Sequence, residues 1–243
     1  MIPDSYEIWG TWGPRAETPE ELAVRFERLI DRLAAIDPVL DGWIWVTRKR
    51  LKRLATIRER NKLFEAIADK VARSDFGNPE PDMGYSMIVV NSVKDTPRTI
   101  GIRINAGGWS KFGSYVSLHT HSRLSPDPAI VTYAVFKEAL LALVESFEAT
   151  TCRAYRSDML DMLDNSEKFR AGWMVYLAPV CARLVTPPQS AIVEHRPDGG
   201  LLMAATRETF VTTKPQHMAV VYDIARAIAP LNALPWPLDG SQV

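Results

Sequence analysis

The chain has 243 residues, of which 47% are hydrophobic and 24% are charged, and its formal net charge at pH 7 is zero. This length and composition are those of a folded globular protein with a sizeable core. With no net charge, no overall field attracts nucleic acid or an anionic membrane. The first ten residues lack the basic and apolar regions of a secretory signal, and the most apolar segment, 129–147, is interrupted by Lys137, Glu138 and Glu145. We therefore expect a cytoplasmic protein without a membrane-spanning helix.

The best-specified element is a helix that follows an opening segment rich in tryptophan and glycine. Thr18 is the expected N-cap, Pro19 is the first helical residue, and Glu21 completes a capping box. Proline at position 38 ends the helix at Asp37. One apolar stripe runs along it and consists of Leu22, Phe26, Leu29, Ile30 and Leu33. The flanking tryptophans are expected in the core and at its rim: Trp9, Trp12, Trp43 and Trp45.

The rest of the chain predicts strands mixed with helices. Strands are expected at 42–47, 85–91, 99–105, 114–121, 151–155, 173–177, 191–195 and 201–205. Helices are expected at about 63–71, with Leu63, Phe64, Ile67 and Val71 inside, at 129–147, capped by Asp127-Pro128, and at 215–229. Short turn-like links favour antiparallel pairing. The prediction is an α+β fold, an antiparallel β-sheet with helices packed against it, as a single domain over residues 1–243.

A basic stretch, residues 48–62, follows the second aromatic strand. It contains one acid, Glu59, and eight basic residues: Arg48, Lys49, Arg50, Lys52, Arg53, Arg58, Arg60 and Lys62. Such a stretch is the main argument for an alternative function, a nucleic-acid-binding regulator. A solvated surface balanced by acids elsewhere explains the same residues, and the zero net charge favours that simpler interpretation.

Two histidines suggest a further and weaker alternative, a small metal-dependent enzyme. His119 and His121 alternate along a predicted strand, so both side chains would leave the same face and could share a metal ion. A zinc site needs two more ligands, which the fold would have to supply from His195, His217, Asp127 or a cysteine. A pair of exposed histidines on a sheet is the simpler interpretation. Cys152 and Cys181 lack metal-binding spacing and are expected to be buried thiols.

Catalytic motifs are missing from the sequence. The segment 108–112 (G-W-S-K-F) begins like the nucleophile elbow of a hydrolase, but Phe112 stands where the second glycine is needed. Two glycine-rich phosphate-binding motifs, G-x-x-x-x-G-K-[ST] and G-x-G-x-x-G, are both absent from the sequence. The chain also lacks the Asp/Glu-x-Lys triplet with which a restriction-type nuclease would hold magnesium and activate water. We therefore expect a protein that is not an enzyme, with no catalytic residue, no cofactor and no metal site.

Two acidic segments are the candidate binding residues for a protein partner. The first is a loop, with Asp75, Phe76, Glu80 and Asp82, and the second contains Asp158, Met159, Asp161, Asp164 and Glu167. Acidic runs are usually solvated surface, but carboxylates also suit the basic, phosphate-binding cleft of a nuclease, where complementary charge speeds docking. Phe76 and Met159 would add apolar contact area.

The chain resembles the bacterial immunity protein 52 family. The resemblance is carried by W-G-T-W-G-P-R-A-E at 9–17, by the helix end I-D-P at 36–38, and by the glycine-tryptophan strand that begins at Gly42. The segments G-W-M-V-Y-L at 172–177 and A-P-L-N-A-L-P at 229–235 also fit. Proteins of this family are α+β chains of similar length, encoded beside predicted nuclease toxins of the restriction-endonuclease fold.

This resemblance implies a non-enzymatic immunity protein that neutralises a cognate nuclease toxin of the type VI secretion system. It would bind the toxin directly and block the active site or a surface that the toxin needs. The implied partner is the toxin protein; no membrane partner is expected, and nucleic acid is expected only through the toxin. No family motif marks the residues that contact the toxin, so the two acidic segments are candidates on their charge alone.

Overall fold

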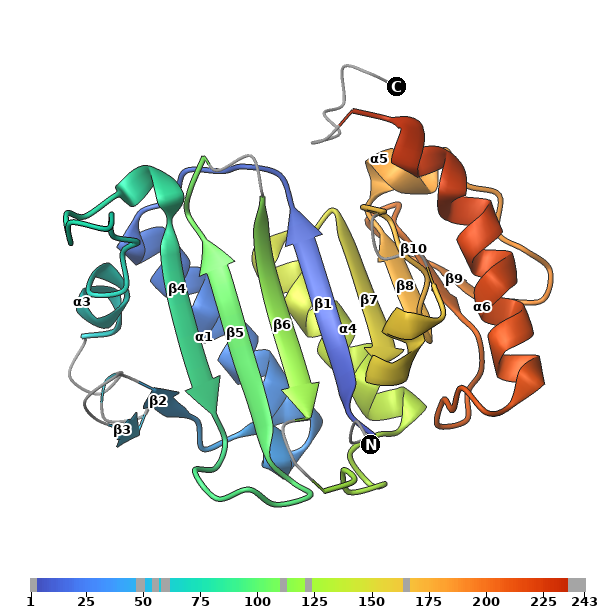
Figure 1. The fold of residues 1–243 in the computed structure, drawn as a ribbon, viewed down its shortest axis with the longest axis horizontal. Helices are drawn as coiled ribbons and strands as arrows, with labels where there is room; N and C mark the ends of the chain where they lie inside the picture. The colour runs from blue at the N-terminus through green and yellow to red at the C-terminus, as the bar shows by residue number, and fades with distance from the viewer. Residues whose placement is uncertain are drawn as a thin grey trace.

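The structure is a computed structural model of the chain, which describes residues 4–46, 51–53, 57, 62–109, 113–120, 124–163 and 167–235. Within these residues, ten strands form one antiparallel sheet in the order β3-β2-β4-β5-β6-β1-β7-β8-β10-β9 (Figure 1). Helices pack against this sheet, so the predicted α+β fold is confirmed. None of the helices described is long and apolar enough to cross a membrane.

The eight predicted strands are present, each with bounds within two residues of those expected, and the structure adds two more, Tyr6–Trp12 and Leu51–Arg53. The strands are β1 Tyr6–Trp12, β2 Ile44–Val46, β3 Leu51–Arg53, β4 Tyr85–Val90, β5 Ile100–Ala106, β6 Ser114–Thr120, β7 Thr151–Arg156, β8 Met174–Leu177, β9 Ile192–His195 and β10 Leu201–Ala204. The α-helices are α1 Pro19–Ile36, α3 Leu63–Ala68, α4 Tyr133–Phe147, α5 Pro179–Ala182 and α6 Pro215–Ile228. A short 3-10 helix, Ser157–Asp161, follows β7.

Strand β1 lies in the middle of the sheet, although it comes from the beginning of the chain. Its residue Ile8 is opposite Leu118 of β6 on one side and Ala154 of β7 on the other. The strands β4, β5 and β6 form the predicted antiparallel meander on one side of β1. Strands β7, β8, β10 and β9 continue the sheet on the other side (Figure 1). The first and second halves of the chain therefore share one sheet.

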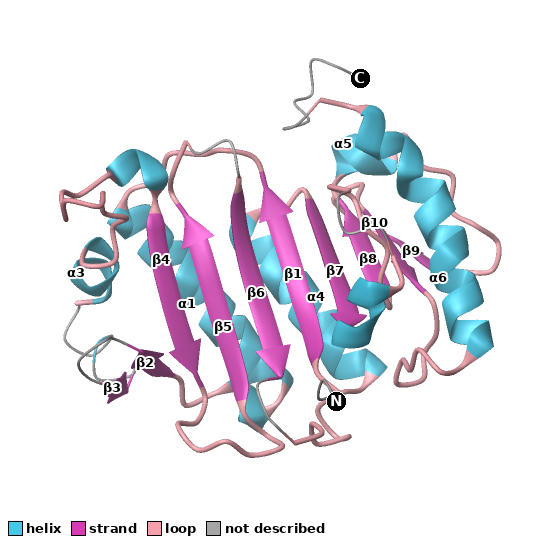
Figure 2. Ribbon diagram, viewed as in Figure 1, coloured by secondary structure: helices cyan, strands magenta, loops and turns pink. Residues whose placement is uncertain are grey.

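Helices α1 and α4 lie together on one face of the sheet (Figure 2). The capping box of α1 is present, because the Thr18 hydroxyl accepts the Glu21 amide proton at 3.2 Å and the Glu21 carboxylate accepts that of Thr18 at 2.8 Å. All five residues of the predicted apolar stripe are buried. The sequence therefore specified both the start of this helix and the face that it buries.

Three predicted details of the helices are wrong. Val71, expected on the inner face of the helix at 63–71, lies beyond its end at Ala68, in an isolated β-bridge with Tyr85. Helix α4 begins after Thr132, whose hydroxyl accepts the Val135 amide proton, whereas Asp127 closes a turn by accepting the Ala129 amide proton. An Asp-Pro pair suits a turn as well as a helix start, which explains the error. Phe64, expected on the inner face of α3, is 39% exposed, because this helix has six residues and buries only Leu63 and Ile67.

Helix α6 lies on the other side of the sheet, at the β8-β10-β9 end (Figure 2). Val175 and Met203, which share that side with Arg153 of β7, are fully buried. In the described part of the chain no α-helix lies over β4, β5, β6 and β1 on this side (Figure 2). The middle of the sheet is thus packed on one face and open on the other.

Candidate functional site

The uncovered sheet face consists of the side chains that β5, β6, β1 and β7 point away from α1 and α4. Strand pairing arranges them in three rows across the sheet. The rows are Gly101, His119, Glu7 and Tyr155; then Arg103, Ser117, Trp9 and Arg153; then Asn105, Tyr115, Thr11 and Thr151. Because directly opposite Cβ atoms lie about 4.5–5.5 Å apart, each side chain lies within reach of its neighbours in the same row.

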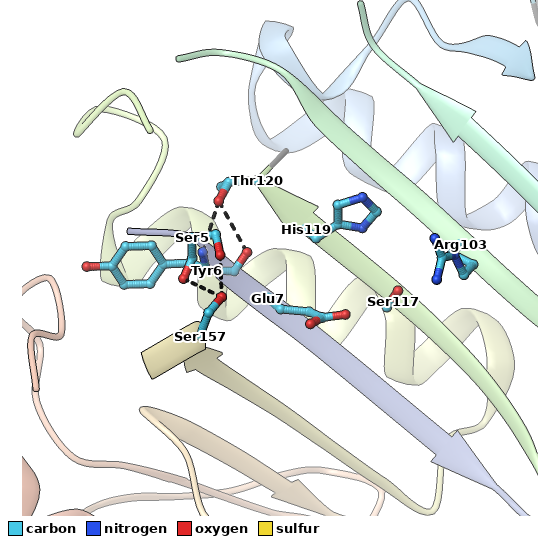
Figure 3. A pocket seen from close by; sticks show the side chains of 8 residues that line it. All are labelled: Ser5, Tyr6, Glu7, Arg103, Ser117, His119, Thr120 and Ser157. Carbon is cyan, nitrogen blue, oxygen red and sulfur yellow. Dashed lines mark hydrogen bonds between the residues drawn. The ribbon is translucent and has the colours of Figure 1, made fainter. Parts of the chain in front are cut away.

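A pocket of about 310 Å³ lies over this face (Figure 3). It is lined by Ser5, Tyr6, Glu7, Arg103, Ser117, His119, Thr120 and Ser157. The short side chain of Ser117, in the middle of β6, leaves part of this space open. A Cβ atom on Gly101 would lie 2.6 Å from Nε2 of His119, so the imidazole ring covers the glycine. The glycine therefore determines where the histidine ring can lie.

Glu7 is the carboxylate at the centre of the pocket (Figure 3). It accepts a hydrogen bond from the Tyr155 hydroxyl at 2.6 Å, and the guanidinium of Arg153 lies 4.3 Å from the centroid of the Tyr155 ring. Burial raises the pKa of Glu7 above its ordinary value, although Tyr155 and Arg153 oppose the shift. Burial also lowers the pKa of Arg153 to about 10, and the positive charge of Arg170 acts in the same direction.

An aromatic pair lies beside this charged cluster. The rings of Trp9 and Tyr115 are stacked, with centroids 4.4 Å apart and an interplanar angle of 15°. Both residues are half-buried, so part of each ring faces solvent. Trp9 shares a row with Arg103 and Arg153. The uncovered sheet face thus combines tryptophan, tyrosine and arginine, the residue types that contribute most to protein–protein binding.

The raised pKa of Glu7 predicts a pH-dependent effect of Glu7→Gln on stability. A carboxyl group whose pKa is higher in the folded state stabilises the fold below its unfolded pKa, and this contribution is lost as pH rises through the folded pKa. The ordinary value is 4.5. We therefore expect Glu7→Gln to gain stability relative to the wild type as pH rises from about 4 through the raised pKa of Glu7 towards neutrality. Urea denaturation of both proteins across this range measures it, and a difference that stays constant with pH would contradict it.

The first acidic segment lies on the surface, as a loop between α3 and β4. Its residues Asp75, Glu80 and Asp82 are exposed, and Phe76 is 93% exposed. Backbone hydrogen bonds hold the loop in place, including one from the amide of Trp109 to the carbonyl of Asp82 at 2.8 Å. Trp109 is itself 65% exposed. The structure therefore adds to this loop a tryptophan that sequence reasoning had considered only as part of a defective hydrolase motif.

The second acidic segment is divided by the fold. Asp161 is exposed and Glu167 is half-buried, but Asp158 accepts a hydrogen bond from the Thr212 hydroxyl at 2.6 Å and lies 3.2 Å from Arg156. Met159 is buried, with 1% of its surface exposed, because the 3-10 helix turns it into the core. Met159 is therefore no part of an exposed surface, and the carboxylate of Asp158 is already paired within the fold. Asp164 lies outside the described residues.

The structure places one of the two paired histidines. His119 lies in the first row of the uncovered sheet face, and His121 is outside the described residues. Of the other histidines, His195 is exposed on β9, and His217 is buried, stacks on Phe210 and accepts the amide proton of Val211. Among the described residues, no group of three or more histidine, cysteine, aspartate or glutamate side chains is arranged to hold a metal ion.

The two cysteines are free and buried, as predicted. Burial raises the pKa of Cys152, and raises that of Cys181 to about 12. Since the thiolate is the reactive form, neither thiol is activated as a nucleophile at neutral pH.

The basic stretch falls mostly outside the described residues. Of its eight basic residues, the structure describes the backbone of Lys52 and Arg53 in β3, and it describes Lys62 ahead of α3. The nucleic-acid-binding alternative therefore stays a prediction from the sequence.

The site is an uncovered sheet face with a pocket, on an α+β fold, and comparison with known proteins identifies the family. The family model described as immunity protein 52 matches residues 4–232. The chain therefore belongs to the immunity protein 52 family.

A solved structure has a similar fold. It is the Pseudomonas aeruginosa T6SS protein PA0821, which matches with a TM-score of 0.53 and 12% sequence identity. The alignment covers 93% of this chain and 73% of that chain. At this identity the similarity is one of fold alone. No curated protein matches the sequence.

Proposed function

We propose that this protein is an immunity protein that binds and neutralises a cognate nuclease toxin, delivered by a type VI secretion system, without catalysing a reaction itself. The observation that carries the proposal is the match to the immunity protein 52 family over residues 4–232. The fold shared with a T6SS protein of P. aeruginosa supports the choice of secretion system. The protein would act in the cytoplasm, where an incoming nuclease meets its nucleic acid.

The exposed acidic loop offers a way to recognise such a toxin. A nuclease cleft is basic because it binds phosphates. The carboxylates of Asp75, Glu80 and Asp82 would take positions that phosphates otherwise occupy, while Phe76 and Trp109 would supply apolar contact area. Asp161 and Glu167 are further acids that would steer the approach. Inhibition would follow from covering the active site or another surface that the toxin needs.

The function is tested with the toxin encoded beside the gene for this protein. Co-expression of the two proteins in sensitive cells should restore growth, and the purified pair should elute as one complex in gel filtration. A toxin from an unrelated immunity pair serves as the control and should remain lethal. If the neighbouring toxin forms no complex and kills cells that express this protein, the proposed function is wrong.

Charge reversal in the acidic loop is expected to slow toxin binding. In the double variant Glu80→Lys and Asp82→Lys, we expect the association rate to fall about tenfold, because rim charges act mainly on the approach of the partners. Both side chains are exposed, so the melting temperature should stay close to that of the wild type. Stopped-flow or biosensor kinetics at low and high salt measure the effect.

The matched control reverses two exposed acids on the helix-covered side, Glu20→Lys on α1 and Glu138→Lys on α4. This variant should associate at the wild-type rate. Equal association rates for both double variants would exclude the acidic loop from the interface.

A further inference from the structure

We infer that the uncovered sheet face is a second docking surface for the toxin, on which Arg103 and Arg153 bind carboxylates of the toxin that otherwise hold its catalytic metal ion. This inference rests on the proposed function, since its occupant is the toxin. It concerns a surface distinct from the acidic loop, and different side chains test it.

The shape of the surface is the first argument. Helices α1 and α4 cover one face of the sheet and α6 covers only the β8-β10-β9 end of the other, as Figure 2 shows. The stacked rings of Trp9 and Tyr115 remain partly exposed in the opening. Beside them is the pocket of about 310 Å³ around Glu7 (Figure 3). A face that offers flat aromatic rings next to a pocket has the form of a binding surface.

The charge of the surface is the second argument, and it selects the partner. Arg103 and Arg153 lie at the two ends of one row, three strands apart, which corresponds to roughly 14 Å. Among the described residues of the three rows, Glu7 is the one carboxylate, and Arg103 and Arg153 are the two arginines. The positive charge of Arg170 acts on Arg153 from nearby. The arginines thus outnumber the acid, and a carboxylate brought by a partner would find favourable charge.

The rigidity of the surface is the third argument. The guanidinium of Arg153 lies over the Tyr155 ring, and the Tyr155 hydroxyl donates to Glu7. Glu7 and Arg153 are held in this arrangement although burial shifts the pKa of each towards its neutral form. A cluster that is already ordered loses little conformational entropy when a partner binds.

The chemistry of a nuclease supplies carboxylates in a fitting place. A magnesium-dependent nuclease holds its metal ion with carboxylate side chains, next to a basic rim that binds phosphates. The planar guanidinium of arginine matches a carboxylate with two parallel hydrogen bonds. The exposed acids of loop 75–82 fit the rim, and the arginines of the uncovered sheet face fit the metal-binding carboxylates. Both charge patterns of this chain therefore complement one nuclease cleft.

The first test is the variant Arg103→Glu, because this side chain is exposed. Its melting temperature is measured alongside, since the reversal places a second acid in the pocket of Glu7. Titration against the purified wild-type toxin is expected to give a dissociation constant about 10- to 100-fold higher than that of the wild type. Arg103→Gln should show a smaller loss in the same direction. The control is Arg28→Glu, an equal charge reversal at an exposed position of α1 on the helix-covered side, and it should bind as the wild type does.

The second test is competition with the metal. Added MgCl₂, at ionic strength held constant with NaCl, should weaken binding of the wild-type protein, because Mg²⁺ and the arginines would compete for the same carboxylates. The dissociation constant of Arg103→Glu should depend less on Mg²⁺. The inference is wrong if wild type, Arg103→Glu and Arg28→Glu bind the toxin with equal affinity. It is also wrong if the wild-type affinity does not change with Mg²⁺. In either case the proposed function stands.

Two further outcomes distinguish a failure of this inference from a failure of the proposed function. If the wild-type protein forms no complex with the toxin, both the proposed function and the inference fail. Light scattering on the protein alone tests the other occupant, a second copy of this chain. A dimer that Arg103→Glu converts to a monomer, with toxin affinity unchanged, would assign the uncovered sheet face to self-association and overturn the inference.

Discussion

Replacing Phe26 with alanine is expected to lower the free energy of unfolding by about 3–5 kcal/mol. Phe26 is fully buried in the apolar stripe of α1, and its ring meets that of Trp45 edge to face, with centroids 5.9 Å apart. Truncation removes this contact and leaves a cavity between α1 and the sheet. The β2 strand that carries Trp45 is paired with β3 and β4, so the backbone there cannot move in to fill the space.

The measurement is urea denaturation of Phe26→Ala and of a control on the same helix. Val24 is 58% exposed, and Val24→Ala should change the free energy of unfolding by no more than about 0.5 kcal/mol. A Phe26→Ala protein that unfolds like the wild type but no longer binds the toxin would place this ring in an interface, against its assignment to the core.

Local signals in the sequence were sufficient for α1 and for most strands. Thr18 and Glu21 cap the helix through groups three residues apart, so the capping box can be recognised without knowledge of the fold. The hairpin of β9 and β10 is equally local, because its turn residues 196–200 lie between the two strands that they connect. The start of α4 was missed because Asp127 and Thr132 are both suitable caps; in the fold Asp127 closes a turn that precedes the buried Ile130 and Val131, and Thr132 caps the helix.

The uncovered sheet face was not predicted, although its signal was present. Alternation along β6 separates Val116 and Leu118 from Tyr115 and Ser117, so two faces were visible in the sequence. Which face stays open depends on where α1, α4 and α6 pack, and the row that joins Glu7 to Tyr155 depends on β1 lying between β6 and β7. These are long-range pairings, and residue spacing does not encode them.

The second acidic segment shows the same limit at single residues. Asp158 and Asp161 are alike in the sequence, but one accepts a hydrogen bond from Thr212 and the other is exposed. Likewise, Met159 was expected to contact a partner because it is apolar and lies among acids, but the structure buries it in the core. Met159 is buried because of the 3-10 helix that follows β7, and no periodic pattern in the sequence predicts this short helix.

The W-G-P-R-A-E segment of the family resemblance has a structural role, from which a second large effect follows. Glu17 is buried, with a side-chain exposure of 4%, and lies 2.5 Å from Arg25 and 3.2 Å from Arg15. The same two arginines lie 3.2 and 3.0 Å from Glu148, the left-handed residue that ends α4. Arg15 also donates to the carbonyl of Phe147. This ion network ties the link between β1 and α1 to the C-terminal end of α4.

We expect Arg25→Ala to lower the free energy of unfolding by about 3 kcal/mol, near the lower end of the cost of breaking a buried ion pair, because Arg15 remains beside Glu17. The loss should be much smaller in the double variant Glu17→Met with Arg25→Met, since apolar side chains of similar volume leave no buried charge without its partner. Urea denaturation of Glu17→Met, Arg25→Met and the double variant measures this coupling.

The pH dependence of Arg25→Ala gives an independent check on the same network. The hydrogen bond from Arg25 lowers the pKa of Glu148 below its ordinary value of 4.5. A carboxyl group with a lowered pKa stabilises the folded state above its ordinary pKa, and that contribution is lost as pH falls through the folded value. The stability difference between wild type and Arg25→Ala should therefore shrink as the pH falls below 4.5. Additive losses in the double variant, or a difference that grows in acid, would mean that Arg25 stabilises the fold by packing and not through its charge.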